Sequence, residues 1–202
     1  MRERAAGLSS EELYFSADVE ADGPIPGPFS MLSFGLCLAG RFDGERFVRL
    51  DPEQASFYRE LRPISDRFEP DALAVSGLDR DALTETGADP VVAMSEAHAW
   101  VLDRARTARP VLVAYPLGFD WMFLYWYFVR FCPDGSPFGF SSCLDVKTLY
   151  AAKARVPVGE ATRSRMPEPL LPQREHTHHA LADALAQAEL FANLFEWRPS
   201  PS

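Results

Sequence analysis

The sequence predicts a single α/β domain in which an antiparallel three-strand meander is followed by helices and one further strand. Apolar, strand-forming runs separated by turn residues fill the N-terminal quarter, and helical patterns bounded by proline dominate the rest. With 202 residues, of which 47% are hydrophobic, the chain can bury one sizeable core, and little in it suggests a second domain.

Three segments near the N-terminus have the composition of strands. Residues 13–19 are apolar enough for a buried strand, and residues 30–39 and 46–50 flank a turn at 40–45. Sequential strands joined by short turns usually pair antiparallel, which predicts the meander.

Helices and one strand are predicted beyond the meander. Pro52 opens a short helix at 52–54, Pro90 precedes a longer helix over 91–106, and a strand at 111–114 follows Pro110. Further helices are predicted over 119–131, 144–153 and 179–195, the last because its apolar residues lie near one helical face. The proline-rich segment 156–175 lacks periodicity and predicts a long loop. Polar ends predict flexible tails at 1–12 and 198–202 around one domain at 13–197.

The composition favours a cytoplasmic protein that is not in a membrane. The three cysteines, Cys37, Cys132 and Cys143, are odd in number and lie in apolar stretches typical of a reduced core. The most apolar run, 111–132, is interrupted by Pro116 and Asp120, which predicts a strand, a turn and a buried helix instead of a membrane span.

The net charge of −9 argues against a broad basic surface that grips duplex DNA. It leaves room for a small acidic site in which metal ions restore the attraction for phosphate. A protein with this net negative charge could therefore still act on short or single-stranded ends of nucleic acid.

Two acids end the first predicted strand. Asp18 and Glu20 are two positions apart, so their side chains project from the same face. Like charges held together are unfavourable without a cation, and oxygen ligands suit Mg²⁺ or Mn²⁺. The alternative is a pair of solvated acids at a strand end.

A third acid, Asp120, opens a helix whose next residues are aromatic or aliphatic. A metal site explains a charge at this position. The alternative is a helix cap, because an acid in the first turn complements the helix dipole.

A fourth acid follows a group of histidines. Asp183 lies on the last predicted helix, and His178 lies five residues earlier, just before it begins. An imidazole beside a metal-binding carboxylate is suited to act as a general base. The alternative is a transition-metal site of a zinc-dependent hydrolase, built from His176, His178 and His179 with Cys143 as a fourth ligand.

Together these segments resemble a known family. Asp18 and Glu20 in D-x-E, Asp120 in G-F-D, and His178 with Asp183 in H-x-A-L-x-D resemble, in this order, the motifs of DEDDh-type 3'-5' exonucleases. That family includes proofreading subunits, ribonuclease T and oligoribonucleases. The resemblance implies a ribonuclease-H-like mixed sheet flanked by helices, and residues 75–78 resemble the family's helix-linking segment.

The resemblance also implies roles for the five residues. Asp18, Glu20 and Asp183 would bind one ion, Asp18 would bridge to a second, and Asp120 would help through water. His178 would deprotonate the attacking water. A two-metal reaction with Mg²⁺ or Mn²⁺ would release nucleoside 5'-monophosphates.

Substrate-binding residues are predicted at three positions. Met31 and Leu32 lie where relatives place an apolar wedge against the terminal base, and Phe119 is placed to stack on a base. Core packing is the alternative for all three. Tyr115-Pro116 replaces a His-Asn pair of many relatives, and an insertion at 22–28 follows the acidic pair, so the pocket for the terminal nucleotide is expected to differ.

The expected partner is single-stranded nucleic acid or a short oligonucleotide, with RNA and DNA both open. A dinucleotide hydrolase and a silent nucleic-acid-binding domain are the other readings of the same fold. The aromatic helix has more apolar surface than one core face needs, which suggests a homodimer.

Overall fold

The structure is a computed structural model, and it describes residues 11–199. The tails predicted at 1–12 and 198–202 therefore lie mostly outside the described residues. Glu12, which the sequence placed in the N-terminal tail, is the first residue of strand β1 (Glu12–Ala21).

The centre of the fold is a mixed sheet. Its other strands are β2 (Met31–Phe42), β3 (Phe47–Arg49), β4 (Ser56–Glu60), β5 (Arg109–Ala114) and β6 (Cys143–Asp145). The order is β3-β2-β1-β5-β6, and β4 also pairs with β2. Antiparallel pairing of β1 with β2 and of β2 with β3 confirms the predicted meander, whereas β5 runs parallel to β1.

Two local predictions were wrong. The segment at 52–54 forms turns and leads into β4 instead of a helix, because residues 56–60 find backbone partners along β2 and bury Phe57 there. Leu144 belongs to β6 and not to the helix, since it pairs with Val113 of β5. The helix begins one position after Asp145, whose side chain accepts a hydrogen bond from Lys147 N and caps it.

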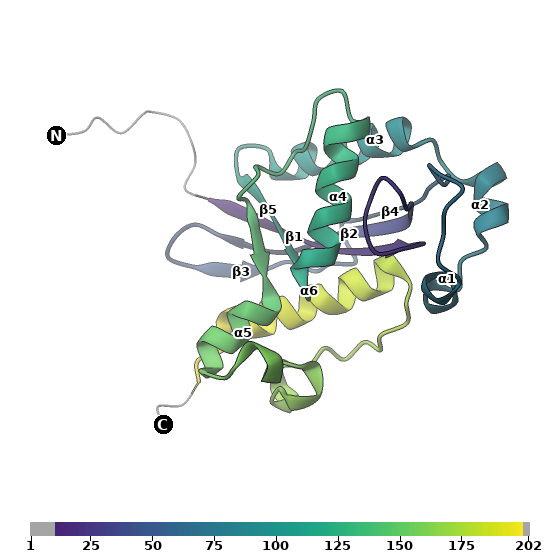
Figure 1. Cartoon of the computed structure of the whole chain (residues 1–202). Coiled ribbons are helices and arrows are strands. Elements are labelled where there is room, and N and C mark those ends of the chain that lie inside the picture. The colour runs from purple at the N-terminus through teal and green to yellow at the C-terminus, as the bar shows by residue number, and fades with distance from the viewer. Residues whose placement is uncertain (1–10, 200–202) are drawn as a thin grey trace.

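Helices cover both faces of the sheet. They are α1 (Pro70–Ser76), α2 (Arg80–Thr86), α3 (Pro90–Ala105), α4 (Leu117–Phe131), α5 (Val146–Ala154) and α6 (Ala180–Glu196). Figure 1 shows α6 on the lower side of the sheet and α3 on the upper side. The predicted link between two helices at 75–78 is confirmed, because α1 ends at Ser76 and Gly77 adopts a φ of 66° before α2 begins.

The side chains of β1 divide between two cores. Leu13, Phe15 and Ala17 alternate into the core that α3 and α4 cover. Tyr14 faces the other way and packs against Phe191 of α6, with ring centroids 5.0 Å apart. Because the strand alternates, Asp18 and Glu20 point to the same face as Tyr14, which is the face that α6 covers.

A glycine lets α6 approach the sheet closely. A Cβ atom at Gly35 would lie 2.5 Å from the Cα atom of Leu181, at the beginning of α6. Gly35 pairs with Asp18 across β2 and β1. The first turn of α6 therefore rests on the backbone beside Asp18, which brings Asp183 to the acidic end of β1.

The predicted long loop at 156–175 is confirmed. It contains three short 3-10 turns, at Val158–Glu160, Arg163–Arg165 and Glu168–Leu170. Ala161, Met166 and Leu170 are buried in the core beneath α6, so the loop packs on the domain along much of its length.

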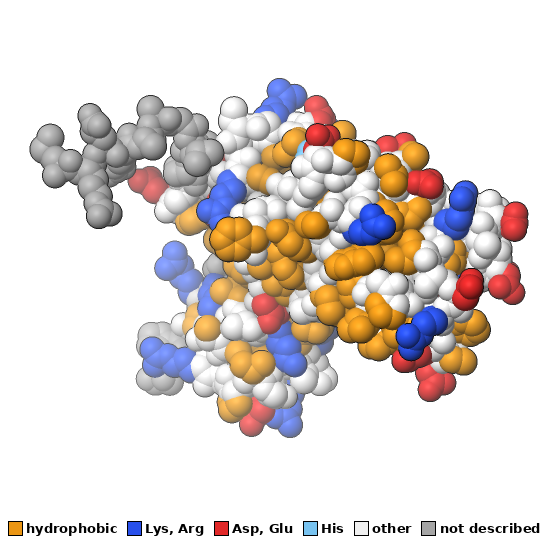
Figure 2. Space-filling view, turned by 45° about the horizontal axis from the view of Figure 1, so that its top comes forward, with side chains coloured by type: hydrophobic (Ala, Val, Ile, Leu, Met, Phe, Trp, Pro, Cys, Tyr) orange, Lys and Arg blue, Asp and Glu red, His pale blue; other side chains and the backbone are white. Residues whose placement is uncertain are grey.

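The most apolar run forms a strand, a turn and a helix, as predicted. Over residues 11–199, no helix is both long and apolar enough to cross a membrane. Figure 2 shows hydrophobic side chains gathered on the face that includes α4, beside scattered Lys and Arg side chains. Val129 of α4 is 59% exposed. The homodimer stays a prediction.

Candidate active site

Three carboxylates from two elements converge. One ligand atom from each of Asp18, Glu20 and Asp183 lies within 4.8 Å of the other two. Glu20 is 8% exposed and Asp183 is fully buried, so the group lies between the end of β1 and the first turn of α6. The predicted convergence of Asp18 and Glu20 on one face is confirmed.

Asp120 joins the same end of β1 from the other side. Its Oδ1 accepts a hydrogen bond of 3.0 Å from the backbone N–H of Val19, the residue between the two acids of the strand. Asp120 is 5% exposed and stands in the first turn of α4. It lies outside the group of three ligand atoms, which agrees with an indirect role.

Gln187 is a residue that sequence reasoning missed. It is 1% exposed on α6, one turn after Asp183. Its Nε2 donates to Asp18 Oδ1 at 2.5 Å, and its Oε1 accepts from Tyr115 N at 2.6 Å. The amide thereby fixes the Asp18 carboxylate against the end of β5. The signal in the sequence that could have indicated this role was a polar Gln four positions after Asp183, on the same face of the predicted helix.

Burial and mutual repulsion raise the pKa values of three acids in this group, Asp18, Glu20 and Asp120. Burial raises the pKa of Asp18 well above its usual range, and the charges of Asp120, Glu20 and Asp183 raise it further. Burial and then the charge of Asp183 raise the pKa of Glu20 to about 7. The pKa of Asp120 is also raised, chiefly by burial.

These features fit divalent cations. Within residues 11–199, no Lys or Arg side chain forms an ion pair with any of these four acids. Asp183 Oδ1 accepts from Thr177 N at 2.9 Å, whereas Oδ2 is buried and accepts no regular hydrogen bond. Buried carboxylates that repel one another, with no Lys or Arg partner among the described residues, form the environment that a hard cation stabilises.

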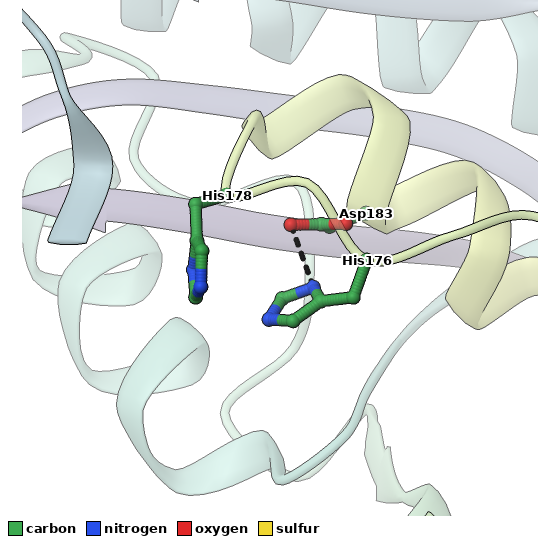
Figure 3. A group of neighbouring side chains, drawn as sticks. All are labelled: His176, His178 and Asp183. Carbon is green, nitrogen blue, oxygen red and sulfur yellow. Dashed lines mark ion pairs between the residues drawn. The ribbon is translucent and has the colours of Figure 1, made fainter.

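Three histidines surround the beginning of α6. His178 is exposed, with a φ of 55°, and His176 Nδ1 lies 2.8 Å from Asp183 Oδ2. Figure 3 shows both rings projecting from the segment before α6, with the Asp183 carboxylate beside them. His179 instead caps α6 by accepting from Ala182 N, and its ring stacks on Tyr58. Cys143, considered as a fourth ligand, belongs to neither group of candidate ligands among the described residues.

The predicted substrate-binding residues separate into two sets. Met31 and Leu32 are both 0% exposed, which favours the core-packing alternative over the wedge. Met31 N is also held by the Tyr127 hydroxyl at 2.7 Å. Phe119 is 38% exposed and remains accessible.

Phe119 lines a hollow beside the acids. The hollow has a volume of about 300 Å³, and its walls are mainly apolar. Its lining residues are Val19, Glu20, Ala21, Gly23, Pro24, Glu69, Ala72, Val75 and Phe119. The segment after β1 and helix α1 thus form walls next to a candidate metal ligand.

The insertion after the acidic pair is anchored by a buried ion pair. Asp22 is fully buried, and its Oδ2 lies 2.9 Å from Arg80 Nε of α2. Its Oδ1 accepts from Ser30 N, and its backbone oxygen accepts from Glu69 N. These contacts join the insertion to the elements that carry the opposite wall of the hollow.

A comparison with known proteins identifies the family. The chain is 36% identical over 184 residues to the 3'-5' DNA exonuclease Cap18 of Escherichia coli, covering 91% of each protein. The chain belongs to the DEDDh-type 3'-5' exonucleases. No protein-family model matches this DEDDh exonuclease. It is a 3'-5' exonuclease, and its carboxylate cluster is one that could hold a divalent metal ion.

Solved structures confirm the ribonuclease-H-like fold. The nuclease domain of 3'hExo, a DEDDh family member bound to rAMP, has a TM-score of 0.67 at 14% identity, with 95% of this chain and 94% of that chain covered. E. coli exonuclease I in complex with a dT13 oligonucleotide has a TM-score of 0.61 at 17% identity. That match covers 93% of the present chain but only 41% of exonuclease I.

Proposed function

We propose that this DEDDh exonuclease removes nucleotides from the 3' end of single-stranded DNA and releases nucleoside 5'-monophosphates. The observation that carries the proposal is the convergence of three carboxylates, Asp18, Glu20 and Asp183, without a Lys or Arg ion-pair partner among the described residues. Asp120 joins the same end of β1 from the other side. DNA is favoured because the curated relative at 36% identity is a DNA exonuclease.

We assign the metal site to Asp18, Glu20 and Asp183, with Asp120 acting from the other side of β1. Two bound ions, Mg²⁺ or Mn²⁺, would supply Lewis-acid stabilisation of the charge that develops on the scissile phosphate. Gln187 orients Asp18 through the hydrogen bond to its Oδ1, so it acts as a positioning residue.

His178 is proposed as the general base. Its side chain is exposed beside the acids and belongs, with His176 and Asp183, to a group whose ligand atoms lie within 4.8 Å of one another. An exposed imidazole there can take a proton from water and return it to solvent.

The hollow beside Glu20 is proposed to receive the base of the terminal nucleotide, with Phe119 as one wall. Its apolar lining offers contact area without reading the base, so all four bases would be accepted. Phe119→Ala is expected to raise KM by about tenfold, since stacking on one base contributes about 1–3 kcal/mol. Steady-state kinetics on single strands measure this, and an unchanged KM would remove Phe119 from the site.

The deciding experiment compares 5'-labelled single-stranded DNA and RNA of equal sequence, with Mg²⁺, Mn²⁺ or chelator. The expected result is a DNA ladder that shortens from the 3' end and is abolished by chelator. Asp183→Asn and His178→Ala should both stop the shortening.

The matched control is His98→Gln. His98 contacts the backbone oxygen of Gly135 on the side of the fold covered by α3, so this variant should keep the activity. Faster shortening of RNA would overturn the assignment to DNA. No shortening of either strand by folded protein, with hydrolysis of dinucleotides instead, would move the function to small substrates.

A further inference from the structure

A second group of candidate metal ligands shares one residue with the carboxylate site. One ligand atom from each of His176, His178 and Asp183 lies within 4.8 Å of the other two. The two imidazole rings are 4.4 Å apart between centroids. This arrangement differs from the carboxylate site, because two of its three ligands are nitrogen atoms.

Asp183 directs one carboxylate oxygen, Oδ2, into this group. The side chain is fully buried, and Oδ1 is occupied by the Thr177 N–H. Oδ2 accepts no regular hydrogen bond and lies 2.8 Å from His176 Nδ1. Figure 3 shows this oxygen facing the His176 ring. In a tetrahedral zinc site, ligand atoms at about 2.0–2.2 Å from the ion lie roughly 3.3–3.6 Å apart, so the two atoms need to separate only slightly to bind one ion.

The remaining ligands are free to adjust. The His176 side chain is 48% exposed and His178 is also exposed. Either ring can therefore rotate to bring an imidazole nitrogen to coordination distance from the ion. Two imidazoles with one carboxylate bind late first-row ions strongly, whereas Mg²⁺ prefers oxygen ligands. With three protein ligands, the fourth position of a tetrahedral ion would be taken by water.

We propose that His176, His178 and Asp183 form a second metal site, which takes a late first-row ion such as Zn²⁺ and holds the exonuclease in an inactive state. The inhibitory part rests on the proposed function, because the ion would occupy the His178 imidazole and Oδ2 of Asp183. The binding part does not depend on it. His176 is then the residue that distinguishes the second site from the carboxylate site.

Calorimetric titration of the full chain with Zn²⁺ tests the binding. His176→Gln should weaken Zn²⁺ binding by about tenfold or more, and His98→Gln should leave it unchanged. His176 is exposed, so its replacement leaves the core intact. Equal Zn²⁺ affinity of wild type and His176→Gln would overturn the proposal.

A second measurement tests the inhibition separately. The cleavage rate is measured in saturating Mg²⁺ over a range of Zn²⁺ concentrations, and each rate is divided by the zinc-free rate of the same variant. His176→Gln should need about tenfold more Zn²⁺ for half-inhibition. An unchanged half-inhibition point would refute inhibition through this site. Loss of Zn²⁺ binding in His176→Gln with no nuclease activity in wild type would instead uphold the site and reject the proposed function.

Discussion

Asp18→Asn is expected to lower the cleavage rate by at least about 10³-fold and, at the same time, to raise the unfolding temperature of the metal-free protein at pH 8. The rate falls because a metal ligand is lost, and metal stabilisation of the transition state is worth several kcal/mol. Stability rises because the most repelled of the buried carboxylates becomes neutral. The Asn oxygen can still accept from Gln187 Nε2, so the local hydrogen bond is retained.

Thermal unfolding in chelator and cleavage in Mg²⁺ are measured on the same preparations. Asp134→Asn, the same change at an exposed position, should alter neither property. An Asp18→Asn protein that unfolds at a lower temperature than wild type at pH 8 would contradict the repulsion argument, even if its activity were lost.

The stability of the metal-free protein is expected to fall as the pH rises from about 5 to about 8, and divalent metal should reverse the fall. Glu20 has a pKa of about 7 in the folded protein, and the pKa values of Asp18 and Asp120 are also raised. Over this range the folded state therefore binds more protons than the unfolded state, so stability decreases with pH. The loss from Glu20 alone is on the order of 3 kcal/mol, or about 6–12 °C.

Unfolding temperatures measured from pH 5 to pH 8, with chelator and with Mn²⁺, check this prediction. The gain from Mn²⁺ should be small at pH 5 and largest at pH 8, because the ligands must be deprotonated. The acids would be shown not to repel one another in the folded state by either of two results. One is a gain in unfolding temperature from Mn²⁺ that is the same at pH 5 and pH 8. The other is a chelated protein that becomes more stable toward pH 8.

The fold was predictable from the sequence wherever the pattern was local. The apolar composition of residues 13–19 predicted β1, and apolar residues near one helical face predicted α6. β4 and β6 were missed because they are short and exist through pairing with β2 and β5. Such strands depend on distant partners, which a local pattern does not contain.

For the site as well, features set by local sequence were predictable, and features set by contacts across the fold were not. The spacing of Asp18 and Glu20 predicted their shared face, and the motifs predicted which acids belong together. Gln187 was missed because its role depends on two hydrogen bonds that cross the fold to Asp18 and Tyr115. Met31 was considered for the substrate because position along the strand does not show that its side chain is fully buried.

The contact at Gly35 also bears on how the protein can change over evolution. Strand β2 and the first turn of α6 meet there backbone to backbone, so no side chain sets the spacing between Asp18 and Asp183. Residues elsewhere in the two cores can drift in size and repack while that spacing stays constant. Position 35 has no such freedom, because any added side chain would push the helix away from the strand.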